Sequence, residues 1–370
     1  TSSLSSKTAF SFLSDSGDVS SSLTYADIDA KSRGVASFLA KSRVKAGDRV
    51  VLVYPPSLDY IVSFLGCLMA GVIAVPVFPP DPADLNKHVD MFCVIVKSCG
   101  AKVALTSASY NYATKLAGIR SFVNSASDTV TWPELSWFVT DGVAPNPEFT
   151  YTVPSSENIA FLQYTSGSTS EPKGVMISHG NLAHNLQCII KGLKADESTV
   201  VVSWLPQYHD MGLIGSYLGI LFCGGSGFYL SPVSFVRKPS LWILAMSRYK
   251  ATHMQAPNFA YGLTARKFKA DAASGDKIDL SSVRHMINAA EPVDTGGMEA
   301  FYNKFAEYGL KRGVIFPTYG LAEHTVYVCS NGKQILTVDK AALETERMVV
   351  LVDSDATGVA TLVGCGVPNE

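Results

Sequence analysis

A short loop rich in serine, glycine and threonine is the first place in this chain where residue types and spacing indicate chemistry. Residues 164–174 read YTSGSTSEPKG and lie between the apolar runs 159–163 and 175–177. Small residues let the backbone approach a ligand, their N–H and O–H donors suit phosphate oxygens, and Lys173 adds a mobile positive charge. The loop lacks the GxxxxGK[ST] and GxGxxG patterns, which excludes a Walker A loop and a dinucleotide fingerprint. On composition alone, a phosphate-binding loop and a flexible linker are about equally well supported.

Three other segments place polar or aromatic side chains where predicted strands end. They are residues 203–213 (SWLPQYHDMGL), 288–293 (NAAEPV) and 317–323 (PTYGLAE). Open α/β sheets bind ligands at the carboxyl ends of their strands, so all three are candidate site segments. Tyr319 offers a ring that can stack on a base, and Glu323 offers a hard oxygen ligand for Mg²⁺. Taken singly, a core tyrosine and a solvated glutamate are the commoner roles of such residues.

His209 is a further candidate because Asp210 follows it directly. The carboxylate can fix the tautomer of the imidazole, or it can cap the helix that is predicted to follow. His179 and His184 are five residues apart, which places them off one helical face and argues against a shared metal site.

Helices and strands alternate along most of the chain, and these elements must position the candidate residues. A helix begins after Thr24, a good N-cap, and another is capped by Ser57 and ends near Gly71. The stretch 123–154 is rich in polar residues and proline and is predicted to be a surface loop. Further helices are expected over 87–98, 241–248, 257–268 and 296–308 and after His179, and strands over 49–54, 72–77, 102–105, 159–163, 200–203, 227–230, 251–254, 283–288 and 314–317.

Repeated strand–helix units predict mostly parallel sheets whose two faces are both covered. We therefore expect an α/β chain in which residues 1–330 form two packed α/β subdomains with mostly parallel sheets. Residues 331–370 change pattern, with short β segments expected at 335–338, 348–352 and 361–363. They predict the start of a smaller, β-rich third subdomain that the chain end truncates.

Two uncharged runs are long enough to be considered as membrane spans. Residues 60–80 contain Gly66, Gly71 and Pro76, and residues 211–236 contain the sequence GGSG in the middle. Such breaks favour a buried helix followed by a turn and a buried strand in both runs. We therefore expect no transmembrane span.

The composition excludes several classes of protein. Of the 370 residues, 47% are hydrophobic and 17% are charged, and the net charge is −2. A disordered chain is excluded by the apolar content, and the absence of a basic excess argues against a dedicated nucleic-acid partner. The seven cysteines are dispersed and include no CxxC, which predicts free thiols in a reducing compartment and a cytoplasmic location.

Together these segments resemble the adenylate-forming superfamily, which comprises acyl-CoA synthetases, amino-acid adenylation domains and luciferases. The chain looks most like the fatty acyl-AMP ligase branch, over nearly its whole length and in the family's order. The residues that carry the resemblance are 161–185 (FLQYTSGSTSEPKGVMISHGNLAHN), 203–213, 256–261 (APNFAY), 289–293 (AAEPV), 319–325 (YGLAEHT) and 63–80 (SFLGCLMAGVIAVPVFPP).

The resemblance implies a two-step reaction with ATP and Mg²⁺. A fatty acid attacks the α-phosphate of ATP to give an acyl-adenylate and pyrophosphate. The acyl group then passes to the phosphopantetheine thiol of an acyl carrier protein or polyketide synthase. Because two anions must meet, positive charge and hydrogen-bond donors are needed where they react.

The resemblance also implies roles for individual residues. Lys173, His209, Thr318 and Glu323 would be catalytic, with Glu323 holding Mg²⁺ and with His209 and Thr318 near the reacting carboxylate. Residues expected to bind the nucleotide fall into two sets: the phosphate set is Thr165, Ser166, Gly167, Ser168, Thr169 and Lys173, and the adenine set is Ala289, Ala290, Glu291, Tyr319 and Gly320.

Members of this superfamily carry a ribose-binding aspartate in a later loop and a small C-terminal domain with a catalytic lysine. We expect both to lie beyond Glu370, so the C-terminal small domain is absent and residues 1–370 alone should turn over weakly or not at all. Fatty acyl-AMP ligases also carry an insertion soon after the YGLAE segment, and residues 333–352 lie where it is expected.

Three functions stay open on the sequence. The first is a fatty acyl-AMP ligase, and the second is a long-chain acyl-CoA ligase with CoA as acceptor. The third is a non-catalytic relative that binds a nucleotide or a lipid, although such a relative would be expected to lose Lys173 or Glu323. An amino-acid adenylation domain is a weaker variant, because it usually has a substrate-binding aspartate where His209 lies.

Overall fold

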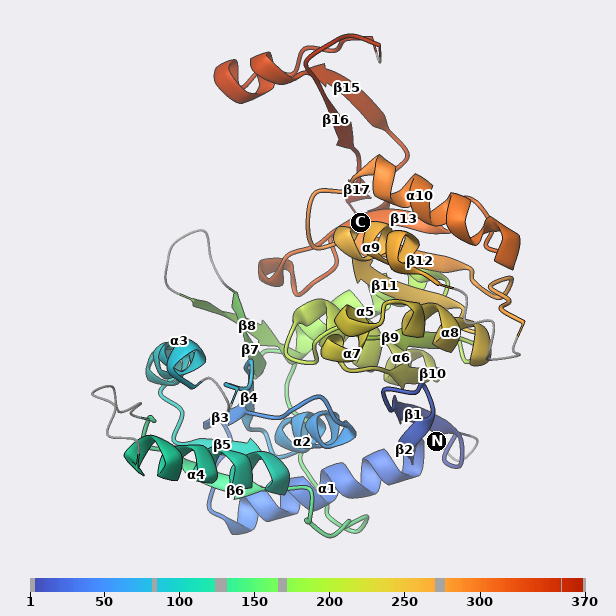
Figure 1. Cartoon of the computed structure of the whole chain (residues 1–370). Helices are drawn as coiled ribbons and strands as arrows, with labels where there is room; N and C mark the ends of the chain where they lie inside the picture. Colours follow the sequence, from blue (N-terminus) through green and yellow to red (C-terminus); the bar gives the residue numbers. More distant parts are fainter. Residues whose placement is uncertain are drawn as a thin grey trace. The chain divides into compact units, whose positions relative to one another are not determined.

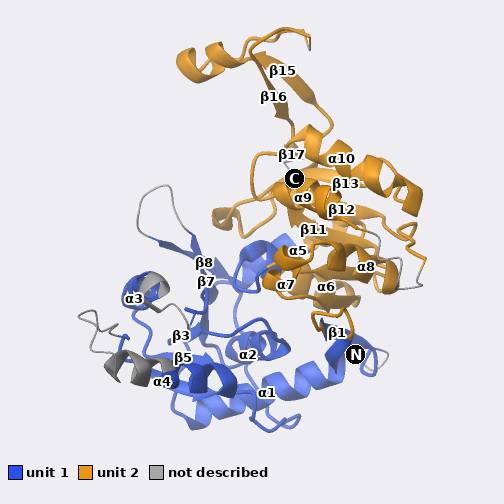
Figure 2. Cartoon of the chain, in the orientation of Figure 1, with its two compact units in different colours: residues 1–12, 19–186, 206–213 blue, residues 13–18, 187–205, 214–370 orange. Residues whose placement is uncertain are grey.

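The protein is described by a computed structural model, shown in Figure 1, that describes residues 4–81, 85–123, 132–165, 172–269, 277–353 and 355–368. The chain divides into two compact units (Figure 2). Unit 1 comprises residues 1–12, 19–186 and 206–213, and unit 2 comprises residues 13–18, 187–205 and 214–370. Each unit contains a sheet dominated by parallel pairs, which confirms the expected mixed α/β class.

Unit 1 is built on a six-stranded sheet in the order β6-β5-β3-β4-β7-β8. All its pairs are parallel except β7–β8, which is antiparallel. Its elements are β1 (Thr8–Leu13), β2 (Val19–Thr24), α1 (Tyr25–Lys41), β3 (Arg49–Leu52), α2 (Leu58–Met69), β4 (Ile73–Pro76), α3 (Leu85–Cys99), β5 (Val103–Thr106), α4 (Ala108–Val123), β6 (Ser136–Val139), β7 (Ile159–Thr165), β8 (Lys173–Ser178) and the start of α5 (His179–Leu193).

The central strands of unit 1 are buried on both faces, as parallel strands between helices must be. Val51, Val53 and Val75 pack against Phe92 and Val96 of α3, whereas the intervening Val50 and Leu52 are also fully buried. Because alternate residues of a strand point to opposite faces, this burial explains the near-continuous apolar sequence of β3.

Local signals set the helix starts, with one difference from the expectation. Thr24 forms a complete capping box with Asp27 at the start of α1. Ser57 occupies the N-cap position of α2, but its side chain makes no capping hydrogen bond. Helix α2 ends at Met69 and β4 follows, so the run 60–80 is the predicted helix and strand. No helix among the described ranges has the length and hydrophobicity needed to cross a bilayer.

Unit 2 contains seven strands that lie side by side in one sheet, in the order β17-β14-β13-β12-β11-β9-β10. The pairs among β9 to β13 are parallel, and β14 and then β17 are added antiparallel beyond β13. Its elements are β9 (Val200–Ser203), the π-helix η1 (Met211–Leu218, which begins in unit 1), α6 (Gly219–Cys223), β10 (Ser226–Tyr229), α7 (Pro232–Arg237), α8 (Ser240–Arg248), β11 (His253–Pro257), α9 (Asn258–Lys267), β12 (His285–Ala289), α10 (Thr295–Phe305), η2 (Ala306–Tyr308), β13 (Ile315–Tyr319), η3 (Ala322–His324), β14 (Cys329–Asn331), β15 (Ile335–Asp339), η4 (Ala342–Glu346), β16 (Val359–Val363) and β17 (Gly366–Pro368).

Strands β1 and β2 and helix α4 were not among the expected elements, and three further segments differ from their expected form. The predicted loop 123–154 contains β6, which pairs with β5. Part of the run 211–236 is a π-helix rather than an α-helix. Residues 348–352 do not form a strand, although Leu351 makes a bridge to Val338 of β15. These segments are short, and their pairing is decided by distant residues rather than by local pattern.

Residues 331–368 combine two arrangements. Strands β15 and β16 form a separate two-stranded antiparallel sheet, whereas β14 and β17 extend the main sheet of unit 2. The segment 333–352 forms β15 and η4. All seven cysteines are free.

Two histidines lie side by side inside unit 2, on the neighbouring strands β11 and β12. His253 bonds the Leu193 carbonyl through Nε2 (2.9 Å) and Thr252 Oγ1 through Nδ1 (2.8 Å). His285 stacks on Phe316 with ring centroids 3.7 Å apart, and its Nδ1 has no partner among the described residues. Burial lowers the pKa of His253, and burial, with a smaller effect of His253, lowers the pKa of His285 to about 3. Both rings are therefore neutral in the fold at neutral pH.

The first prediction concerns a close contact of α1. A Cβ on Gly34 would lie 2.4 Å from the carbonyl oxygen of Ala144, whereas a Cβ on Gly142 would meet nothing within 4 Å. Alanine normally stabilises a helix interior relative to glycine, but here it must displace backbone. We expect Gly34→Ala to lower the free energy of unfolding by about 1–3 kcal/mol, measured by urea denaturation. The control Gly142→Ala should change it by less than about 0.5 kcal/mol, and an equally stable Gly34→Ala variant would contradict the packing described.

The second prediction concerns acid stability. The folded pKa of His285 lies below its unfolded value of ~6.5, so the unfolded chain binds the proton first as pH falls. Stability is therefore full above pH 6.5 and is lost below it, by about 2 kcal/mol at pH 5 from this group. Urea denaturation at pH 7.5 and pH 5.0 measures the loss, and His285→Leu should reduce it. An unchanged pH dependence in that variant would show that His285 is not the group responsible.

Candidate functional site

In unit 1, antiparallel pairing places Thr165 and Lys173 directly opposite each other at the end of β7 and the start of β8. The loop between them was predicted to bind phosphate. Its candidates Ser166, Gly167, Ser168 and Thr169 lie outside the described residues. Lys173 is exposed, so its ammonium group is accessible to a ligand.

The strands on either side of this loop are fixed by packing. A Cβ on Gly174 would lie 2.8 Å from Cζ of Tyr164, so glycine is needed for the ring to cross the strand. The Tyr164 hydroxyl donates to Ser98 Oγ of α3 (2.9 Å). The PKG end of the loop is therefore held by the sheet and by α3 together.

Two glutamines hold the segment that carries His209, and sequence reasoning did not select either one. Gln207 Nε2 donates to the Ser57 carbonyl (2.7 Å), and its Oε1 accepts from the Ser57 N–H (2.9 Å). Gln163 Nε2 donates to the Tyr208 carbonyl (3.1 Å). Both side chains are buried, so water cannot replace these bonds easily. Gln163 belongs to β7, two residues before Thr165. Its hydrogen bond therefore connects β7 to Tyr208, the residue before His209.

His209 is paired with Asp210, as the sequence suggested. Its Nδ1 lies 2.8 Å from Asp210 Oδ1, which also accepts from the Met211 N–H (2.5 Å) at the start of η1. Asp210 thus contacts the imidazole and also the backbone N–H of the first residue of η1. Burial lowers the pKa of His209, but the Asp210 carboxylate outweighs it and raises that pKa above its ordinary value. The His209 side chain is 51% exposed, so water screens this pair and its contribution to stability is small.

In unit 2, the candidate adenine-binding residues gather at the carboxyl edge of the sheet. Strands β11, β12 and β13 are in register, with Pro257 beside Ala289 and Asn288 beside Pro317. Ala289 is buried at the end of β12, and Ala290 and Glu291 are exposed beyond it. Ala290 has φ of +69°, a left-handed conformation that L-residues rarely adopt. Backbone strain of this kind clusters at functional sites.

The Glu291 carboxylate is held by a backbone hydrogen bond from α9. Its Oε1 accepts from the Phe259 N–H (2.6 Å) at the start of α9. A carboxylate is favoured there because the first N–H groups of a helix have no partner within the helix. The Glu291 side chain therefore orients the turn after β12.

The end of β13 carries Thr318, Tyr319 and Gly320. Tyr319 is 52% exposed, so one face of its ring is available for stacking. Thr318 is buried, and its hydroxyl donates to the Phe316 carbonyl (3.0 Å) and pairs with Ser330 Oγ (2.7 Å). A Cβ on Gly320 would lie 1.9 Å from the Val326 carbonyl oxygen, so the chain returns over this position.

Glu323 lies in η3, the short 3-10 helix that follows, and its side chain is exposed. A carboxylate free to reach a ligand fits Mg²⁺, which usually takes one or two protein carboxylates together with phosphate oxygens and water. No group of three or more His, Cys, Asp or Glu residues that could hold a metal by themselves occurs in the ranges described.

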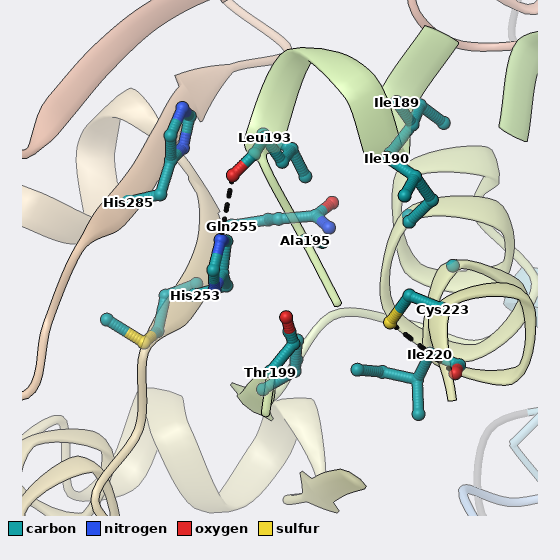
Figure 3. Close-up of a pocket in the computed structure, with 14 residues that line it drawn as sticks. Ile189, Ile190, Leu193, Ala195, Thr199, Ile220, Cys223, His253, Gln255 and His285 are labelled. Atoms are coloured by element: carbon teal, nitrogen blue, oxygen red, sulfur yellow. Dashed lines mark hydrogen bonds between the residues drawn. The ribbon is translucent and has the colours of Figure 1, made fainter. Parts of the chain in front are cut away.

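Two cavities lie away from these residues. A cavity of about 10 Å³ in unit 2 is lined by Gln255, His253 and aliphatic residues of α5 (Figure 3), and it has room for about one water molecule. A cavity of about 930 Å³ in unit 1 lies beside Gly47, Gly71 and Ile159, at the amino ends of its strands. Ligands of α/β sheets bind at the opposite edge, so neither cavity adds to the candidate site.

The chain matches the family described as AMP-binding enzyme over residues 3–359. It is 35% identical to JamA of Moorena producens, a medium-chain-fatty-acid–[acyl-carrier-protein] ligase, with 98% of this chain and 61% of that protein covered. It is 34% identical to FadD32 of Mycobacterium marinum, a long-chain-fatty-acid–AMP ligase, with 97% of this chain and 57% of that protein covered. The chain thus spans about three fifths of the length of these relatives.

A solved structure has the same fold. The crystal structure of a fatty acyl-adenylate ligase of L. pneumophila, in complex with acyl adenylate and pyrophosphate, matches with a TM-score of 0.84 and 35% identity. The match covers 98% of this chain and 61% of that one. These relatives confirm the resemblance to fatty acyl-AMP ligases that the motifs indicated.

A third prediction tests the His209–Asp210 pair. Asp210→Asn keeps an oxygen to accept the Met211 N–H but removes the charge beside Nδ1. The pKa of His209 should therefore fall, because burial then acts without the opposing carboxylate. An NMR titration of the histidine Cε1–H signals measures it, with His209→Gln to assign the signal. A pKa that stays the same in Asp210→Asn would show that the pair is not formed.

Proposed function

Because this chain belongs to the AMP-binding enzyme family, we propose that its protein activates a fatty acid with ATP to an acyl-adenylate and releases pyrophosphate. The observation that carries the proposal is the similarity to fatty acid ligases over 97–98% of the chain. We further propose that the acyl group passes to the phosphopantetheine thiol of an acyl carrier protein. The name of JamA, a ligase with that acceptor, supports this choice over CoA.

We assign the phosphates of ATP to the β7–β8 loop. Lys173 would neutralise charge on the phosphates, and Thr165, Ser166, Gly167, Ser168 and Thr169 would donate hydrogen bonds to them. The opposed positions of Thr165 and Lys173 support this, because both ends of the loop then face the same ligand. Donors fixed in place before the reaction stabilise developing charge without reorganisation.

We assign the adenine to the carboxyl edge of β12 and β13. Tyr319 would stack on the base, and Ala289, Ala290 and Glu291 would border it beside Gly320. The exposed ring of Tyr319 and the left-handed turn at Ala290 support this assignment. A purine ring stacks on an aromatic side chain without needing a charge.

We propose that His209 acts on the reacting carboxylate, and we retain the same proposal for Thr318. His209 is the freer of the two, because the Thr318 hydroxyl already donates to a backbone carbonyl. An imidazole whose pKa is raised by Asp210 carries more positive charge near neutral pH and attracts an anion. Orienting the acid toward the nucleotide supplies much of the barrier reduction.

Glu323 would hold Mg²⁺ together with phosphate oxygens. When bound, the ion neutralises phosphate charge and helps orient the oxygens. The exposed carboxylate after β13 supports this role.

We also propose a cytoplasmic location, supported by the free cysteines. The predicted division into an AMP-binding domain at 1–330 and the start of a β-rich subdomain at 331–370 is retained as a proposal. The separate β15–β16 sheet supports a change of architecture there.

The test is acid-dependent ATP–pyrophosphate exchange by the natural full-length protein, with Mg²⁺ and a panel of fatty and amino acids. Fatty acids should support exchange, and Lys173→Ala or Glu323→Gln should lower it by about 10²–10³-fold. Lys45→Ala, which removes an exposed lysine outside the site, is the matched control and should retain full activity.

The panel separates the alternatives. Exchange with amino acids alone would move the protein to the amino-acid adenylation domains. Transfer of the acyl group to CoA but not to carrier protein would establish an acyl-CoA ligase. No exchange with any acid by a folded protein that binds ATP would leave a non-catalytic relative.

A further inference from the structure

We propose that Asn258, the first residue of α9, is a positioning residue for the nucleotide base. It holds the strained turn after β12, to which we have assigned the adenine, so the inference rests on the proposed function. Asn258 lies in the APNFAY segment that contributes to the resemblance, but the resemblance assigned it no role.

The turn needs external support. Ala290 is held at φ +69°, a left-handed conformation that is unfavourable for an L-residue with a Cβ. Strained conformations persist only where the surroundings determine them. The exposed side chains of Ala290, Glu291 and Pro292 bury little area that could do so.

Asn258 connects the two sides of the turn. Its Oδ1 accepts from Asn288 Nδ2 (3.0 Å), just before the turn, and from the Asp294 N–H (2.9 Å), just after it. Asn288 is fully buried, so water cannot substitute for its bond to Asn258. One amide oxygen therefore fixes the spacing between the end of β12 and the start of α10.

The next residue of α9 fixes the middle of the same turn. The Phe259 N–H donates to Glu291 Oε1 (2.6 Å). On the far side, Asp294 Oδ1 and Oδ2 accept from the Gly296 and Gly297 N–H groups and cap α10. The turn is thus held at Asn288, Glu291 and Asp294, and Asn258 supplies two of these three contacts with α9.

The parallel register explains why an α9 residue can do this. Ala256 and Pro257 of β11 lie beside Asn288 and Ala289 of β12. Asn258 therefore follows β11 at the level where Ala290 follows β12. If its oxygen is removed, the turn can relax toward ordinary φ values, and the base loses its bordering surface.

The experiment compares Asn258→Ala and Asn258→Asp in the natural full-length protein. Aspartate keeps an acceptor oxygen in place, whereas alanine removes it. We expect Asn258→Ala to raise the KM for ATP about tenfold or more and to leave the KM for fatty acid within twofold. Asn258→Asp should restore most of the ATP affinity. The control is Asn158→Ala, whose Oδ1 accepts from the Ser155 N–H in unit 1 (2.9 Å), and it should change neither KM.

A second variant guards against a general folding defect. Glycine adopts left-handed φ without strain, so Ala290→Gly should remain folded. In the Ala290→Gly background, Asn258→Ala should raise the KM for ATP less than it does alone. Equal effects in both backgrounds would show that Asn258 does not act through the turn.

The outcomes separate this inference from the proposed function. Fatty-acid-dependent exchange with an unchanged ATP KM in folded Asn258→Ala would overturn the inference and leave the function standing. If the wild type shows no exchange, the function fails, and equilibrium dialysis with ATP decides the inference. A tenfold weaker Kd in Asn258→Ala, restored in Asn258→Asp, would support it, and an equal Kd or no ATP binding by the wild type would overturn it.

Discussion

The parallel register of β11, β12 and β13 is the constraint on which the candidate site in unit 2 depends. Because Pro257 lies beside Ala289 and Asn288 lies beside Pro317, the residues after each strand emerge at one edge. Both faces of β11 and β12 are buried, so a slip of one residue would exchange side chains of different size and polarity between two packed faces. The chemistry at the edge is therefore set by the packing beneath it.

In unit 1, buried polar side chains position the candidate residues. The segment that carries His209 is distant in sequence from β7 and from Ser57, and buried glutamine amides join it to both through backbone groups. An amide can donate and accept at once, so Gln207 satisfies both backbone polar groups of Ser57 without introducing charge. Connections of this kind add no charge near Lys173 or His209.

Much of the fold followed from the sequence, because its signals are local. The uninterrupted apolar run of β9 and the cap at Thr24 each specify an element by themselves. The antiparallel direction of β8, the pairing of β6 and the π-helix at 211–218 did not follow, because each depends on neighbours far along the chain. The motif segments were found through resemblance and include Gln163, Gln207 and Asn258, but only the contacts of these three amides show what they do. Glutamine and asparagine are common on protein surfaces, and only the folded structure reveals that these amides form hydrogen bonds that connect distant segments.

Gly320 shows how such a site would respond to saturation mutagenesis. Any side chain there would overlap the Val326 carbonyl, so every substitution should be as damaging as the loss of a reacting group. If Glu323 holds Mg²⁺ as proposed, a mutational scan of residues 317–326 would score Gly320 beside it, although Gly320 would fail by steric overlap and Glu323 by loss of charge. Intolerance to change at this loop measures how tightly the backbone folds back on itself, and it cannot by itself rank residues by their part in the chemistry.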